Sequence, residues 1–174
     1  KSNDEIWLDL RSDSPGQWSI MGERRMFLHR DLILRFEEYC LPYLDGIPEG
    51  RAEDYAWEGL DEKRSAWWTA AADSARERFV VEGHHVLVRD SSDWGSIARR
   101  HLSYHGLGGI ESMKQIDDYG GVSLGFCTAF HPAIASGVLL GCWERAYGRN
   151  GRASISYEGG RVTLDLLSSR EIAA

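Results

Sequence analysis

The sequence predicts an α+β fold in which an antiparallel sheet is covered by three to four helices. Residues 110–116 and 122–126 alternate like neighbouring strands around a glycine turn, and residues 153–167 repeat this hairpin pattern. An apolar helical segment, Pro132–Tyr147, lies between the two hairpins. Strands paired through short turns, with helices grouped apart from them, are typical of the α+β class. We expect one domain spanning residues 1–174.

The N-terminal part of the chain combines extended segments with one helix. Residues 5–10 alternate apolar and polar side chains, which predicts a strand, and a turn rich in Ser, Asp, Pro and Gly separates them from a second extended segment at 17–21. Asp31 is a candidate N-cap for a helix over residues 32–40, which Pro42 prevents from continuing. We expect the opening strands to join the C-terminal strands in one sheet.

Two further helices are predicted in the middle of the chain. Asp61 can cap a long helix that runs to about Val81 and carries an apolar stripe, in which Trp67 and Trp68 take part. Ser92 can cap a shorter helix that ends near residue 102.

The last predicted helix has one flank without side chains. Pro132 suits its first turn, where the missing N–H costs nothing. Gly137 and Gly141 lie four residues apart and therefore share one face of the helix. A flank of this kind must be approached closely by another backbone or by a ligand.

Composition excludes several classes of partner. The net charge of −7 repels nucleic acid, so we expect no nucleic-acid binding by this chain alone. The longest apolar stretch, residues 132–143, is too short to cross a bilayer, and we expect no membrane partner. Three widely spaced cysteines favour a reducing, cytoplasmic location over a disulfide framework. No signal peptide is recognised. The first residue is Lys1, and the sequence does not decide whether the chain is a fragment of a longer protein.

Aromatic residues supply the candidate binding site. The chain has seven Trp, and each buried ring contributes a large apolar surface and one N–H that needs a partner. We expect one small aromatic-walled pocket near the last two helices, with these ligand-binding residues: Trp94, His105, Phe126, Phe130, His131 and Trp143. The alternative, that these side chains simply fill a solid core, stays open.

Polar residues give weaker indications of chemistry. Cys127 and His131 are four apart, but Pro132 places His131 at a helix start and Cys127 at a strand end, so a nucleophilic pair is not favoured. His101 and His105 have a spacing that can hold a metal on one helix face. Because Gly106 ends that helix and no third ligand is evident, we expect no metal and no cofactor.

The order of elements resembles the vinyl reductase family, also called the hydrocarbon-binding domain. The likeness rests on residues 22–31, 106–126 and 127–167. It implies a site for a small apolar or aromatic molecule, often in a homodimer. Family members with a structural zinc use a late cysteine cluster. Residues 154–162 contain no Cys, so that zinc site is not expected here although Cys127 stands where an early ligand would be.

The sequence therefore favours a domain that binds a small apolar or aromatic molecule as a sensor or carrier. An alternative is an enzyme on the same scaffold, acting on an apolar or tetrapyrrole-like substrate with His131 and Cys127 near the reacting atom. A third interpretation is an interaction module within a larger assembly. The residues alone do not decide whether a reaction is catalysed.

Overall fold

The computed structural model confirms the α+β class. It describes residues 10–15, 17–20, 22–26, 28–47, 53–158 and 161–169. The chain divides into two compact units, residues 1–36 and residues 37–174, and each is described by itself.

The first unit contains a three-stranded antiparallel sheet in the order β1-β2-β3. Its strands are β1 (Leu10–Ser14), β2 (Gln17–Ile20) and β3 (Glu23–Arg25). The prediction that the opening strands join the C-terminal sheet is wrong, because these short strands pair with one another through tight turns. Alternation identifies a strand but not its partner. The strand predicted over residues 5–10 lies outside the described residues except at its last position.

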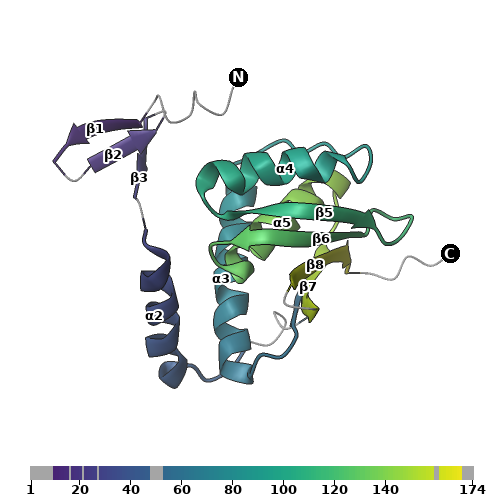
Figure 1. The fold of residues 1–174 in the computed structure, drawn as a ribbon, viewed down its shortest axis with the longest axis horizontal. Coiled ribbons are helices and arrows are strands. Elements are labelled where there is room, and N and C mark those ends of the chain that lie inside the picture. Colours follow the sequence, from purple (N-terminus) through teal and green to yellow (C-terminus); the bar gives the residue numbers. More distant parts are fainter. Residues whose placement is uncertain are drawn as a thin grey trace. The chain divides into compact units, whose positions relative to one another are not determined.

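The second unit is built on a five-stranded sheet in the order β4-β7-β8-β6-β5 (Figure 1). Its strands are β4 (Tyr55–Trp57), β5 (Gly108–Gln115), β6 (Val122–Ala129), β7 (Gly151–Glu158) and β8 (Arg161–Ser168). The two predicted antiparallel hairpins, β5–β6 and β7–β8, are confirmed. The sheet is mixed rather than wholly antiparallel, because β4 pairs in parallel with β7. Three residues are too few to show a strand period, which explains why the sequence did not predict β4.

Four α-helices accompany the sheets in the described part of the chain. They are α2 (Arg30–Cys40), α3 (Glu62–Val81), α4 (Asp93–His101) and α5 (Pro132–Tyr147), with single 3₁₀ turns η1 (Leu41–Tyr43) and η2 (Ser103–His105). Asp61 caps α3 as predicted, since its carboxylate accepts a hydrogen bond from the Arg64 N–H at 2.9 Å. Ser92 makes no such bond with its side chain. Within the second unit, α3 and α5 lie side by side (Figure 1).

The core of the second unit is built around α5, which is buried between the sheet, α3 and α4. Leu124, Leu164 and Ile155 face each other across β6, β8 and β7, and all three are fully buried. A Cβ on Gly137 would lie 2.0 Å from the Ala72 carbonyl oxygen. At Gly141 the nearest atom would be in the Phe79 ring, at 2.9 Å. The side-chain-free flank of α5 is therefore filled by α3, through its backbone at Ala72 and its side chain at Phe79, and not by a ligand.

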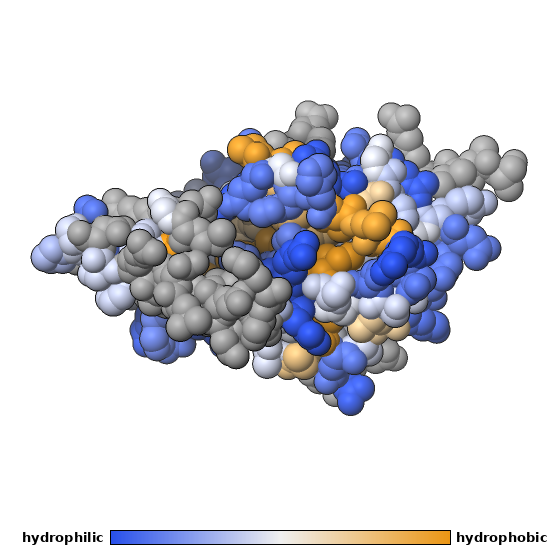
Figure 2. Space-filling model, turned by 90° about the horizontal axis from the view of Figure 1, so that it is seen from above, coloured by the Kyte–Doolittle hydropathy of each residue, from blue (hydrophilic) through white to orange (hydrophobic). Residues whose placement is uncertain are grey.

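The surface follows from this burial. Hydrophilic side chains cover most of the described part of the face seen in Figure 2, with hydrophobic ones gathered near its middle. Among the described residues, no helix combines the length and the hydropathy needed to cross a membrane.

Candidate functional site

A buried carboxylate at the start of the second unit contacts α3 and α5. Glu37, on α2, is only 2% exposed. Its Oε1 accepts hydrogen bonds from the Arg64 guanidinium and, at 3.2 Å, from the Trp68 indole N–H, both on α3. Its Oε2 lies 3.0 Å from Nε2 of His131 at the start of α5. Arg64, Trp68 and His131 together satisfy the carboxylate, whose burial without hydrogen-bond partners would destabilise the fold.

The backbone of α5 fixes the orientation of His131. The residue is the N-cap of the helix, and its Nδ1 accepts a hydrogen bond from the Ala133 N–H at 3.2 Å. A ring whose Nδ1 accepts must carry its proton on Nε2, where it donates to Glu37. Both ring nitrogens are therefore engaged within the protein, and the side chain is 1% exposed.

Aromatic rings extend from His131 in a row, which we call the aromatic row: Trp67, His131, Trp68, Trp57 and Tyr55. The centroids of the Trp67 and Trp68 rings each lie 5.1 Å from that of His131. Trp68 meets Trp57 edge to face at 5.4 Å, and Trp57 stacks on Tyr55 at 5.2 Å. These distances are typical of attractive ring contacts.

The three tryptophans of the aromatic row differ in their polar contacts. Trp57 donates its indole N–H to Thr69 Oγ1 at 2.9 Å, and Trp68 donates to Glu37. The Trp67 indole N–H has no acceptor in the part of the chain that the structure describes, and its ring is only partly buried. Trp67 is therefore the partly exposed end of the row, whereas Tyr55 at the other end is buried.

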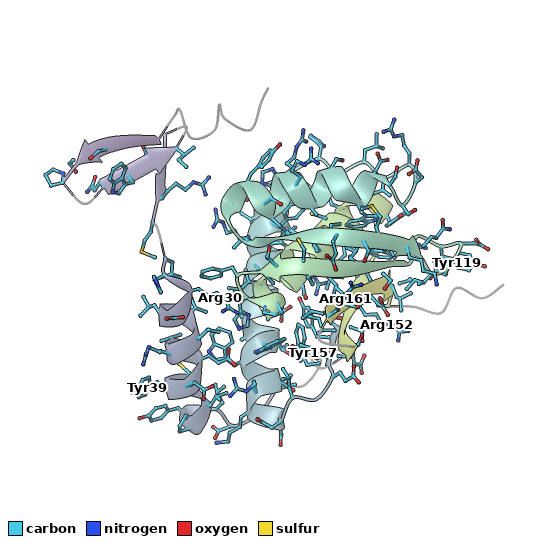
Figure 3. The ribbon with its side chains drawn as sticks, in the orientation of Figure 1. Arg30, Tyr39, Tyr119, Arg152, Tyr157 and Arg161 are labelled. Carbon is cyan, nitrogen blue, oxygen red and sulfur yellow. The ribbon has the colours of Figure 1, made fainter. Side chains whose placement is uncertain are left out.

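The negative charge of Glu37 affects the pKa of Tyr157 on strand β7. Tyr157, labelled in Figure 3, is half-exposed on that strand. Burial raises the pKa of Tyr157, and the negative charge of Glu37 raises it further. An ionised Glu37 thus stabilises the neutral phenol of Tyr157.

The structure separates the residues that the sequence grouped into one pocket. Phe130 and His131 lie at the N-terminal end of α5, whereas Trp143 is buried near its other end, about 18 Å along the helix. Trp94 is buried on α4, and His105 is exposed on η2. Phe126 is buried in β6, opposite Ile110 and Val162 of the flanking strands.

A cleft of about 190 Å³ lies toward the C-terminal end of α5. Its lining includes the rings of Trp94 and Tyr147 and the polar side chains of Arg89, Asp90 and Asp118. Nearby, Trp143 donates its indole N–H to the Gly120 carbonyl at 2.8 Å, in the hairpin turn that carries Tyr119 (Figure 3). The volume is below the range of about 300–1,000 Å³ usual for small-molecule sites.

The residues with catalytic potential do not form a reactive pair. Cys127 is exposed on β6, while His131 is buried and uses its two nitrogens on Glu37 and Ala133. His101 packs its ring against those of Phe79 and His84. Within the described ranges, no group of three or more His, Cys, Asp or Glu side chains is arranged to hold a metal ion.

Glu37 and Trp67 were not identified as site residues from the sequence. Glu37 stands beside Glu38, and no local pattern distinguishes the buried carboxylate from the exposed one. Trp67 was expected only as part of an apolar stripe. The contact between residues 37 and 131 joins positions far apart in the chain, so only the folded structure reveals it.

Comparison with known proteins supports the architecture. No family model matches the chain, and no curated protein matches it. Several solved structures match, among them the crystal structure of the phenol-responsive sensory domain of the transcription activator PoxR with phenol, with a TM-score of 0.56 at 11% sequence identity. The match covers 95% of this chain and 88% of that chain. This chain has the fold of that sensory domain. Membership of the vinyl reductase family stays a prediction.

Proposed function

We propose that this chain, as one domain over residues 1–174, binds a small aromatic molecule and acts as a sensor or carrier. The likeness in fold to a phenol-responsive sensory domain supports binding of a small aromatic ligand. The observation that carries the proposal is the aromatic row, whose partly exposed end is formed by Trp67 packed against His131.

The ligand lies, in this proposal, at the N-terminal end of α5. Trp67, His131 and the partly buried Phe130 supply aromatic walls in this proposal. Phe126, predicted for the same site, is buried in β6. An aromatic guest meets such walls by stacking or edge-to-face contact. Removing its ring from water contributes about 25 cal/mol per Å² of apolar surface, which reaches several kcal/mol for a single ring.

The remaining residues of the predicted pocket take different places in this proposal. Trp94 and Trp143 belong to the cleft end of α5, and His105 is exposed on η2. These three residues are the matched controls for the location of the ligand.

An enzyme on the same scaffold is less well supported. A general base needs a ring nitrogen within reach of the substrate, and both nitrogens of His131 are engaged elsewhere. Cys127 is exposed and lies on a different element from the aromatic row. Recovery of the added aromatic compound unchanged after incubation, measured by mass spectrometry, separates a binder from an enzyme.

The proposed location of the ligand is tested by calorimetric titration of the purified chain with toluene and with phenol. We expect binding of at least one of them, a loss of binding of tenfold or more in Trp67→Leu, and unchanged binding in His105→Gln. Equal loss in both variants, or binding lost only on substitution at the cleft end, would contradict the location. No heat and no thermal stabilisation with either compound would overturn the function.

Two further predictions stand beside this function. The homodimer implied by the family resemblance is checked by analytical ultracentrifugation of the purified chain. The cytoplasmic location expected from the cysteine content is checked by fractionation of the source cells.

A further inference from the structure

We propose that Glu37 is a positioning residue that fixes His131 and thereby makes the site prefer aromatic rings without a hydroxyl group over phenols. This inference rests on the proposed function and names the class of ligand for the same site. It starts from the hydrogen bonds that converge on the Glu37 carboxylate.

The first step concerns the state of the histidine. Glu37 accepts from Nε2 of His131 at 3.0 Å, while Nδ1 accepts from the Ala133 N–H at 3.2 Å. The carboxylate and the helix N-terminus together select one neutral tautomer of the ring. His131 therefore presents ring atoms to a guest and has no nitrogen left to accept a hydroxyl proton.

The second step concerns the other polar groups near the site. The indole N–H of Trp68 and the guanidinium of Arg64 are directed at Glu37, and the indole N–H of Trp57 is directed at Thr69. The Glu37 side chain itself is enclosed, with 3% exposure. In the described residues of the aromatic row, the polar group without a partner is the Trp67 indole N–H, which is a donor only.

The third step follows from the chemistry of the hydroxyl group. A phenol placed here can accept a hydrogen bond from Trp67, but the described side chains of the aromatic row leave no acceptor for its own proton. A hydroxyl group that gives up water without gaining an acceptor is penalised relative to an apolar ring of the same size. Toluene, which has the same ring and no donor, avoids this penalty. We expect the unmodified chain to bind toluene about tenfold or more tightly than phenol.

The role of Glu37 is tested with Glu37→Gln. If the amide oxygen keeps its bonds with Arg64 and Trp68, its NH₂ group faces Nε2 of His131. The ring proton must then move to Nδ1, where it opposes the Ala133 N–H and breaks the helix cap. With the cap broken the ring is no longer held, and Nε2 can turn to accept the proton of a hydroxyl group. We expect the preference for toluene over phenol to fall to about threefold or less in this variant. The matched control is Glu38→Gln, because Glu38 also pairs with Arg64 but is exposed.

Two measurements read out the proposal. Nitrogen-15 NMR of the imidazole ring reports the tautomer of His131 in the unmodified chain and needs no variant to fold. We expect the Nε2–H tautomer in the unmodified chain and in Glu38→Gln, and its loss in Glu37→Gln. An Nδ1–H tautomer in the unmodified chain would overturn the positioning role.

The binding results separate this inference from the proposed function. Phenol binding as tight as toluene binding would refute the preference and leave the function standing. Absence of binding by both compounds would refute the function, and the ligand preference with it. A Glu37→Gln variant that loses stability but keeps the tautomer and the preference would show that Glu37 is only structural.

Discussion

The two ends of α5 are both tied to α3 by an arginine and a carboxylate, but in different ways. At the N-terminal end, Arg64 pairs with Glu37 of α2, and α5 contributes His131. At the C-terminal end, Arg76 pairs through two hydrogen bonds with Glu144 of α5 itself. The two arginines stand on one helix about 18 Å apart.

The difference lies in burial and in the source of the carboxylate. The side chain of Glu37 is 3% exposed and that of Glu144 is 13% exposed. Glu144 also accepts a hydrogen bond from the Gly151 N–H, and Arg76 has a second partner in Asp54. All the partners at this end therefore belong to the second unit itself. The N-terminal end instead depends on a residue from α2. The C-terminal pair is thus formed by α3 and α5 alone, whereas the N-terminal pair takes its carboxylate from Glu37, the first residue of the second unit.

The largest expected effect is that of Glu37→Ala. The change leaves the donors of Arg64, Trp68 and His131 without their shared acceptor in a buried place. We expect a loss of about 3–5 kcal/mol in the free energy of unfolding, measured by urea denaturation.

Two control variants sharpen this prediction. Glu38→Ala removes an exposed partner of Arg64 and is expected to change stability by about 0.5 kcal/mol or less. Glu144→Ala is expected to cost less than Glu37→Ala, because its site is more open and Arg76 retains Asp54. The reverse order for Glu144 and Glu37 would break the comparison between the two ends.

The next largest effect on stability is expected at the contact between the middle of α5 and α3. In Gly137→Ala the new Cβ meets the Ala72 carbonyl oxygen, which belongs to rigid backbone, so α3 and α5 must move apart. We expect a loss of about 3 kcal/mol in thermal or chemical unfolding. Gly95→Ala on α4 is the matched control, since its Cβ meets only the flexible end of Met113. That variant is expected to be neutral or to gain up to about 1 kcal/mol.

A pH effect is expected near the C-terminal half of the helix pair. Burial, followed by the positive charges of His84 and Arg100, lowers the pKa of His101 to about 4. The unfolded chain, with an ordinary histidine pKa of about 6.5, takes up this proton first. Stability is therefore complete above about pH 6.5 and falls by about 3 kcal/mol as the pH is lowered to about 4.

The pH effect is measured by urea unfolding at several pH values. His101→Leu removes the titrating group and is expected to flatten the profile between about pH 6.5 and 4. An unchanged slope in that variant would assign the pH dependence to other groups.

The smallest effect compares two tryptophans at opposite ends of α5. Trp143→Phe removes the hydrogen bond to the Gly120 carbonyl and is expected to cost about 1 kcal/mol. Hydrogen exchange should show faster opening of the β5–β6 turn. Trp67→Phe removes an N–H that has no acceptor within the described residues, and is expected to change stability less. Equal costs for the two changes would show that the bond to Gly120 contributes nothing.

Local patterns in the sequence were sufficient to predict most helices and strands of the second unit. Asp61 and Gly148 mark the ends of α3 and α5 through a side-chain cap and a left-handed glycine, and both act over a few residues. Alternation and glycine turns predicted the β5–β6 and β7–β8 hairpins, since antiparallel neighbours need only a short connection. These features made the α+β class readable from the chain alone.

Only the tertiary structure decided the long-range partners. The parallel pairing of β4 with β7 joins segments that are far apart in the sequence, so no short turn between them predicts it. The occupant of the Gly137 flank was open in the sequence and proved to be the backbone of α3. Glu37 and Glu38 are chemically identical, and Glu37 is the buried one because Arg64, Trp68 and His131 surround it in the folded second unit. A charged side chain can be buried only where folding brings hydrogen-bond partners to it, and the residues next to it in the sequence do not show which partners these are.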